Sequence, residues 1–278
     1  MASETVTLAA QSEDSLSSLK TQFLASLNHE VRTPLTGIVG MIDLLLETSL
    51  DDEQRDYVTT VRLCADDLLA LFNKTLEFSD LSSGRCELTR QEFHLPETLR
   101  NAVMEHAENA RAKNVKLVCR LAPDLPEVAV GDAVRIRQVV SHVVENGVKF
   151  TEHGKVEVVG AGRFDDGRFV LKLKVTDTGI GIPADKQKVI FAPFEQADGS
   201  ITRSYGGTGL GLAISSKLVG LMHGSLWVES PWHKPGAGEV VQGSAFHFTA
   251  RLAPAAPSPL LSHTVGHERE KPSGAAVG

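Results

Sequence analysis

The sequence predicts a chain in two parts, an α-helical hairpin followed by an α+β domain. Two observations predict the hairpin: apolar residues recur at helical spacing from Leu16 to Leu45, and again in a heptad-like pattern from Tyr57 to Phe78. A third observation predicts the second domain. Beyond residue 86, alternating strand patterns and amphipathic helices mix without regular βαβ alternation, which is typical of an α+β layer.

The hairpin is expected over residues 15–82, after a flexible start at 1–14. The segment "ETSLDDEQ" separates the two helical patterns, and either Ser49 or Asp51 could cap the second helix. One hairpin can cover only one side of each apolar stripe, so a second copy would bury the rest in a dimeric four-helix bundle. The alternative, in which the stripes pack on the domain that follows, stays open.

The second domain is expected over residues 86–252, before a disordered tail at 253–278 that is rich in Pro, Ala, Ser and Gly. Its expected strands are "CELTRQEF" at 86–93, "VKLVCRL" at 115–121, a hairpin of 155–164 with 168–177, "GSLWVES" at 224–230 and "GSAFHFTARL" at 243–252. Its expected helices cover 95–114, 132–150 and 209–222, and Asp132 is the expected N-cap of the middle helix.

Composition excludes several classes of protein. The chain has 278 residues and a net charge of −7, which argues against electrostatic binding of nucleic acid. Its three cysteines are far apart and form neither a disulfide framework nor a metal motif. No apolar run approaches the ~20 residues of a membrane span, and the N-terminus lacks the basic start of a signal peptide. These features predict a cytoplasmic chain without a membrane span.

Three clusters point to nucleotide chemistry. On the helix at 132–150, His142, Asn146 and Lys149 are four and three residues apart and share a different side from the apolar stripe. Asp177 ends a strand, where its carboxylate could accept a hydrogen bond from a purine amine. Gly179 and Gly181 would let the backbone pass close to a flat ring.

A rival interpretation of the second cluster is a dinucleotide fingerprint, because "GIGIPA" fits G-x-G-x-x-A. That fingerprint needs a helix to open at the glycines, whereas Pro183 and a long loop follow here.

The third cluster is "GGTGLGLAIS", whose glycines precede a helix. A glycine-rich turn at a helix N-terminus presents bare N–H groups and the positive end of the dipole to a phosphate. The polar stretch "FAPFEQADGSITRSYGG" before it reads as a lid over a nucleotide. Phe191 and Phe194 could anchor this lid, and Arg203 could reach a phosphate.

The first helix carries the segment "LNHEVRTPLTGIVG" at 27–40. A proline inside a helix costs roughly 3 kcal/mol of helix stability, so Pro34 suggests a functional bend one turn beyond His29. The alternative is a fixed kink that is set only by packing. The adjacent His29 and Glu30 do not form the zinc motif H-E-x-x-H, because Thr33 occupies the fifth position.

Five segments together resemble the H, N, G1, F and G2 boxes of a two-component sensor histidine kinase: "LNHEVRTPL", "RIRQVVSHVVENGVKFT", "VTDTGIGI", "IFAPFEQAD" and "GGTGLGLAIS". The likeness covers about residues 15–252, and the segments resemble the transmitter core found in hybrid-type kinases. It implies a dimerisation and histidine-phosphotransfer hairpin followed by an α/β sandwich of the histidine kinase and Hsp90-like ATPase fold.

The resemblance also implies roles for individual residues. His29 would be the phosphoacceptor, Glu30 its general base, and Thr33 would position water for a phosphatase reaction. Asn146 would hold Mg²⁺, with His142 as a second candidate ligand. The implied ATP-binding residues are Asn146, Lys149, Asp177, Gly179, Gly181, Phe194, Arg203, Gly207, Thr208, Gly209, Leu210 and Gly211.

The implied partners are a second copy of the chain, a response regulator receiver domain and an upstream sensor. Two departures from the family pattern affect the N box: His142 stands where Asn is usual and Gly147 where Ala is usual. They leave a pseudokinase scaffold open as the alternative function. An unrelated ATPase of the same superfamily, such as a chaperone or mismatch-repair type, is disfavoured by the H-box hairpin.

Overall fold

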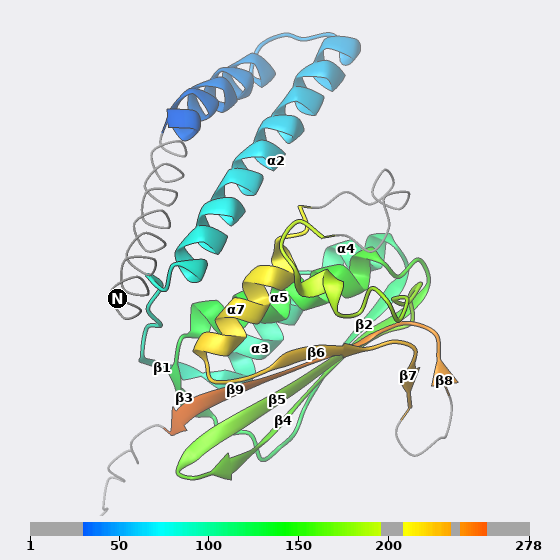
Figure 1. The fold of residues 1–278 in the computed structure, drawn as a ribbon. Helices are drawn as coiled ribbons and strands as arrows, with labels where there is room; N and C mark the ends of the chain where they lie inside the picture. The colour runs from blue at the N-terminus through cyan, green and yellow to red at the C-terminus, as the bar shows by residue number, and fades with distance from the viewer. Residues whose placement is uncertain (1–29, 196–207, 235–239, 255–278) are drawn as a thin grey trace, which may run out of the picture.

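The computed structural model describes residues 30–195, 208–234 and 240–254. Figure 1 shows a long helical hairpin that projects from an α/β sandwich, in which helices cover one face of a twisted sheet. Three predicted site residues, His29, Arg203 and Gly207, lie outside the described residues, as do the expected flexible start at 1–14 and nearly all of the expected tail.

The hairpin consists of a helical segment at 30–46, which runs unbroken through Pro34, and helix α2 at Asp52–Ser82. Asp51, not Ser49, is the N-cap of α2: its carboxylate accepts from the Gln54 amide at 2.8 Å. The Gln54 side chain accepts in turn from the Asp51 amide at 3.3 Å, which completes a capping box. The chain therefore turns sharply between the two helices.

Four helices and a short 3₁₀ turn form the helical layer of the sandwich. They are α3 (Leu95–Met104), α4 (Ala107–Ala112), α5 (Ala133–Lys149), η1 (Val189–Phe191) and α7 (Gly211–Leu221). The prediction of one helix over 95–114 is wrong. The chain breaks after α3, where the His106 amide donates to the Val103 carbonyl and its Nε2 shares a hydrogen bond of 2.8 Å with Ser141 Oγ on α5.

The sheet has the order β1-β3-β9-β5-β4-β2, and β6 also pairs with β9. Its strands are β1 (Gln91–His94), β2 (Val115–Leu121), β3 (Val128–Gly131), β4 (Gly154–Asp165), β5 (Arg168–Asp177), β6 (Leu226–Glu229) and β9 (Ala245–Pro254). Among the strands that the structure describes, β2 and β4 are the one parallel pair. A separate two-stranded ribbon joins β7 (Trp232–His233) to β8 (Val240–Val241).

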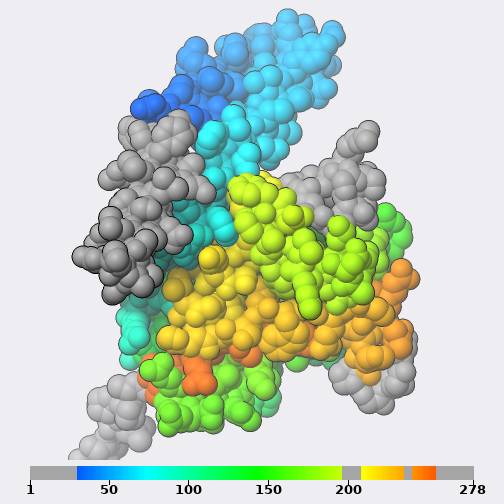
Figure 2. All heavy atoms as spheres, in the orientation of Figure 1, coloured from blue at the N-terminus to red at the C-terminus, as the bar shows by residue number. Residues whose placement is uncertain are grey.

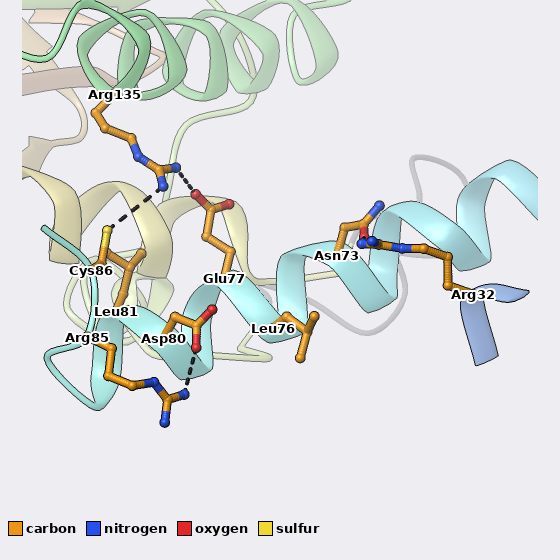
Figure 3. A pocket seen from close by; sticks show the side chains of 9 residues that line it. All are labelled: Arg32, Asn73, Leu76, Glu77, Asp80, Leu81, Arg85, Cys86 and Arg135. Atoms are coloured by element: carbon orange, nitrogen blue, oxygen red, sulfur yellow. Dashed lines mark hydrogen bonds and ion pairs between the residues drawn. The ribbon is translucent and has the colours of Figure 1, made fainter. Parts of the chain in front are cut away.

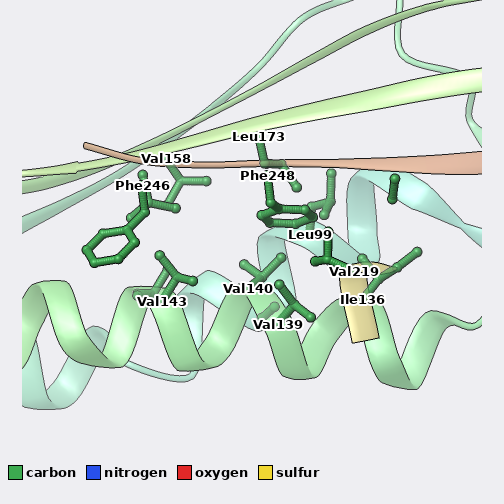
Figure 4. Packing of buried hydrophobic residues seen from close by; sticks show 14 of the residues in the cluster. Leu99, Ile136, Val139, Val140, Val143, Val158, Leu173, Val219, Phe246 and Phe248 are labelled. Atoms are coloured by element: carbon green, nitrogen blue, oxygen red, sulfur yellow. The ribbon is translucent and has the colours of Figure 1, made fainter. Parts of the chain in front are cut away.

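The core lies between α5 and the inner face of the sheet (Figure 4). Val139, Val140 and Val143 point from α5 toward Leu173 and Phe248 on the strands. The apolar stripe predicted on α5 is buried throughout. Each fully buried side chain of this size contributes roughly 1.5–3 kcal/mol, so this packing fixes where the polar side of α5 lies.

The lower end of α2 packs on the sandwich. Leu81 is buried, Phe78 packs against the core, and the Glu77 carboxylate accepts hydrogen bonds from Arg135 and from Gln138 Nε2 (2.9 and 2.8 Å) on α5. Farther up the same stripe, Tyr57 and Val61 are 61% and 52% exposed. The C-terminal part of the stripe thus packs on the following domain, whereas its N-terminal part is exposed. Among the described segments, no helix combines the length and apolarity required to cross a bilayer.

Candidate active site

Helix α5 fixes the first part of the site. Asp132 caps it by accepting from the Arg135 amide at 3.0 Å, and a side next to the buried stripe carries His142, Asn146 and Lys149, all partly buried. At Gly147, an added Cβ would lie 3.1 Å from Val156 on β4 and 3.8 Å from Asp177 Cβ. The glycine therefore lets the second half of α5 lie directly against the end of β5.

Asp177 lies at that strand end and is 5% exposed. Its Oδ1 accepts from the Gly179 amide at 2.9 Å and from the Ser244 amide at 3.1 Å. Burial raises the pKa of the carboxyl to about 6, although these hydrogen bonds oppose the rise. Both of these backbone hydrogen bonds end on Oδ1, and the Ser244 side chain is a third hydrogen-bond partner of the carboxylate.

The turn after Asp177 presses against the end of α5. An added Cβ at Gly179 would lie only 2.3 Å from the Phe150 carbonyl oxygen, so no larger residue fits without a backbone shift. The Ile180 amide donates to the same carbonyl at 3.3 Å, and Gly181 has φ +75°, a conformation that favours glycine. The two glycines expected to permit a close approach to a ring thus also hold the turn in place.

The start of α7 supplies the third part. Gly209 has φ +68°, and an added Cβ would lie 2.9 Å from the Glu195 carbonyl oxygen, which places this turn beside Phe194. In Figure 2 the yellow-green segment that ends at residue 195 lies against the yellow start of α7. Leu210 is fully buried and its amide donates to Thr208 Oγ1 at 3.3 Å.

No side chain caps α7 in the part of the chain that the structure describes. Its first-turn N–H groups and the positive end of its dipole are therefore suited to bind a phosphate. Phe194, predicted as a lid anchor, is 61% exposed and has φ +64°.

His142 joins α5 to α7. Its Nδ1 shares a hydrogen bond of 3.2 Å with the buried hydroxyl of Ser215, and an added Cβ at Gly211 would lie 3.9 Å from its ring. Burial lowers the pKa of this imidazole, and the nearby ammonium of Lys74 lowers it further. His142 thus fills the junction of the two helices, where burial disfavours its charged form.

Lys149 places a half-buried ammonium at the end of α5. Burial is the main reason why the pKa of this ammonium is lowered. The Glu145 carboxylate opposes the shift, and the charges of Lys74 and Lys113 add to it. Its Nζ lies 5.2 Å from the Phe150 ring centroid. Because Lys74 belongs to α2, the hairpin reaches close enough to influence the polar side of α5.

The residues present suit a magnesium ion held jointly with a substrate. Asn146 offers an amide oxygen, the type of ligand that Mg²⁺ prefers. Within residues 30–195, 208–234 and 240–254, no three His, Cys, Asp or Glu side chains gather as a metal cluster. A magnesium ion at Asn146 would therefore take most of its ligands from phosphate oxygens and water.

Glu30 and Thr33 lie at the start of the described hairpin and are exposed. The fold brings together the three predicted clusters on α5, after β5 and before α7. Glu30 and Thr33 lie on a separate element, the hairpin.

Several neighbours of Asp177 could not be predicted from local sequence patterns. Trp232 Nε1 donates to its backbone carbonyl at 3.1 Å, and an added Cβ at Gly243 would lie 2.2 Å from that oxygen. Ser244 and Gly243 lie beside Asp177 because β9 pairs with β5. Only knowledge of that strand order would have pointed to them.

A separate cleft of about 440 Å³ opens between the hairpin and the sandwich (Figure 3). It is lined by Arg32, Asn73, Leu76, Glu77, Asp80, Leu81, Arg85, Cys86 and Arg135. The arginines in it have partners: Arg135 binds Glu77, Arg85 binds Asp80 and Arg32 binds Asn73. None of the predicted nucleotide-binding residues lines this cleft.

The fold and the site together define a class of protein, an ATPase-type α/β sandwich joined to a helical hairpin. Two family models match the corresponding parts of the chain. Residues 131–254 match the histidine kinase-, DNA gyrase B- and HSP90-like ATPases, and residues 19–84 match the His Kinase A (phospho-acceptor) domain. The chain belongs to the two-component sensor histidine kinases and contains their transmitter.

Similar proteins agree with this assignment. The chain is 37% identical over 248 residues to the signal transduction histidine-protein kinase BarA of Escherichia coli, covering 89% of this chain and 26% of BarA. It is 37% identical over 239 residues to the sensor protein GacS of Pseudomonas syringae, covering 85% of this chain and 25% of GacS. The chain thus spans about a quarter of these relatives.

Among solved structures, full-length ShkA in complex with AMPPNP superposes with a TM-score of 0.72 at 36% identity. The match covers 84% of this chain and 46% of ShkA.

Proposed function

We propose that this chain is the ATP-dependent protein-histidine kinase part of a two-component signalling protein. It would transfer the γ-phosphoryl group of ATP to His29, which would pass it to an aspartate of a receiver domain. One observation carries this proposal. The polar side of α5, the turn at 177–181 and the uncapped start of α7 form one site in the chain that bears the H-box hairpin.

The nucleotide would be bound by these three segments. Asp177 accepts from the adenine amine, Gly179 and Gly181 admit the ring, and Phe194 flanks it. Lys149, Arg203 and the backbone at 207–211 bind phosphate oxygens, with Thr208 and Leu210 shaping the turn. Asn146 would hold magnesium, which would supply charge neutralisation at the phosphates. Catalysis then depends mainly on positioning and charge neutralisation.

The hairpin would supply the acceptor. Glu30 draws the proton from the His29 imidazole, so that a neutral nitrogen attacks the γ-phosphorus as the β–γ bridging oxygen leaves on ADP. Thr33, one turn farther on, orients water for hydrolysis of the acyl phosphate on the receiver. Partners would be a second copy of the chain, the receiver and an upstream sensor, in the cytoplasm.

The pseudokinase alternative depends on His142, which stands where the family usually has Asn. The surroundings of His142 do not favour that alternative. The imidazole shares a hydrogen bond with Ser215 in the α5–α7 junction, and the sequence retains Asn146, Asp177 and the glycine-rich segment before α7.

Incubation with γ-labelled ATP and Mg²⁺ tests the proposal. The chain should acquire label that is stable in base and labile in acid, and His29→Gln should abolish it. Acid-stable label, or label that persists in His29→Gln, would refute the assignment of the phosphoacceptor.

A further inference from the structure

No helix covers the other face of the sheet in the described part of the chain (Figure 1), and only at one end does the Trp232 ring of β7 lie against it, 5.0 Å from Lys174 Nζ. Val158, Leu173 and Phe248 point into the core from β4, β5 and β9. Because successive residues of a strand alternate between faces, their sequence neighbours point outward. The register then determines which outward side chains lie next to one another.

One row of outward side chains crosses five strands. Arg120 on β2 pairs with Val159, Val159 with Lys174, Lys174 with His247, and His247 with Trp227 on β6. Trp227 is 41% exposed and stacks on His247, with ring centroids 4.9 Å apart and 4° between the planes. The row therefore mixes positive charge with exposed apolar and aromatic surface.

Positive charge dominates this surface, which we call the basic sheet face. Its outward lysines are Lys116, Lys155, Lys172 and Lys174. Its outward arginines are Arg120, Arg163, Arg168 and Arg251.

Four carboxylates share the face: Glu92, Glu157, Asp165 and Glu229. Glu157 is engaged by Lys155 at 2.9 Å and Arg120 at 3.2 Å. A surplus of positive charge on one face of a chain whose net charge is −7 indicates an anionic partner.

The kinds of residue favour lipid over protein. The centres of protein interfaces are depleted in lysine, whereas Lys172 and Lys174 lie on the central strand of this face. Long lysine and arginine stems with an exposed tryptophan are typical of surfaces at a bilayer interface, where the stems lie against apolar groups and the charges reach the headgroups. Val159, 39% exposed, adds to the apolar part.

We propose that the basic sheet face docks on a bilayer surface rich in anionic lipid. The contact is peripheral and electrostatic, and it involves none of the residues assigned to ATP or to phosphotransfer. Each basic side chain near an anionic leaflet contributes roughly fivefold to partitioning, so several together give a measurable affinity.

Cosedimentation of the full chain with vesicles tests this proposal. The chain should bind vesicles of phosphatidylcholine that contain about 30 mol% phosphatidylserine, and this binding should weaken in high salt. It should not bind vesicles of phosphatidylcholine alone. Lys172→Gln with Lys174→Gln should lower the partition coefficient about 25-fold. The matched control, Arg100→Gln with Arg111→Gln, removes the same charge from exposed sites on helices α3 and α4 and should have little effect.

Tryptophan emission supplies a second measurement. Trp227 should shift to shorter wavelength on binding, and Trp227→Phe should abolish the shift while buried Trp232 remains as an internal reference. The proposal would be overturned if the control variant lost as much vesicle binding as the lysine variant, or if the chain bound uncharged vesicles equally well. Tighter binding to duplex DNA than to the vesicles would also overturn it. Autophosphorylation without vesicles should be the same in the Lys172→Gln, Lys174→Gln variant as in the wild type, so failure here is distinct from failure of the kinase assignment.

Discussion

Asp177 is a carboxyl held in a site that penalises its charge. Its pKa is raised from 3.8 to about 6, chiefly by burial, so ionisation in the folded state is unfavourable. A shift of this size corresponds to about 3 kcal/mol. The unfolded chain ionises from about pH 4 and the folded chain only near 6, so stability falls as pH rises between these values. The penalty is complete above pH 6.

Asp177→Asn should therefore stabilise the protein at neutral pH. Asn keeps an oxygen for the Gly179 and Ser244 amides but carries no charge, so we expect the free energy of unfolding to rise by about 1–3 kcal/mol at pH 7.5. Denaturant unfolding at several pH values measures this. The advantage should shrink to nothing by pH 4, and an advantage that is independent of pH would contradict the account.

Ser215→Ala should weaken the junction of α5 with α7. Removing the hydroxyl leaves His142 Nδ1 without its 3.2 Å partner in a buried place, at a cost of about 1–3 kcal/mol. Thermal or denaturant unfolding checks the loss. Ser216→Ala, one residue farther along the same helix and partly exposed, is the control and should cost much less. Equal effects would mean that the hydrogen bond contributes nothing.

At the scale of elements, Glu77 holds the end of α2 on α5. Its carboxylate receives Arg135 and Gln138 together, whereas a Gln side chain would direct an N–H₂ toward the same donors. Glu77→Gln should therefore increase amide hydrogen exchange over residues 75–82, with a loss of about 1 kcal/mol or less in global stability.

Asp80→Asn is the matched control for Glu77→Gln. Asp80 lies on the same turn of α2 but pairs with Arg85 at the surface, 2.7 Å away, so its loss should leave exchange nearly unchanged. Unchanged exchange in Glu77→Gln would show that apolar packing at Leu81 and Phe78 alone holds the two parts together.

Strong local patterns identified the elements that carry the site. The apolar stripe of α5, its Asp132 cap, and the alternating strands β4 and β5 were predictable because each pattern is long and its end signal is specific. The turn between those strands is where expected, with Asp166 and Gly167 both at positive φ.

Short elements escaped prediction because their form depends on distant contacts. β3, β7 and β8 have four residues or fewer, and pairing across the sheet or the ribbon defines them. The break after α3 depends on His106 meeting Ser141 on another helix. In the same way, Ser244 and Trp232 lie beside Asp177 because of tertiary contacts that no local sequence pattern indicates.

At the scale of the whole molecule, the open part of the hairpin stripe predicts a dimer. Val61 and Leu68 are 52% and 40% exposed in the single chain, and a second hairpin would cover them. Val61→Glu with Leu68→Glu should shift sedimentation from a dimer to the 29.9 kDa monomer. Thr59→Glu, on another side of α2, is the control and should remain dimeric. A wild-type monomer at micromolar concentration would contradict this prediction.

Nucleotide titration tests the central claim most directly, because one site built from α5, the turn after β5 and the start of α7 must bind ATP. With Mg²⁺, calorimetry should show one ATP per chain and much weaker GTP, which presents a carbonyl where adenine presents the amine that Asp177 accepts. Asp177→Asn should weaken ATP binding about tenfold or more and narrow the difference from GTP. Absence of ATP binding, or ATP binding that is indifferent to Asp177→Asn, would contradict the account.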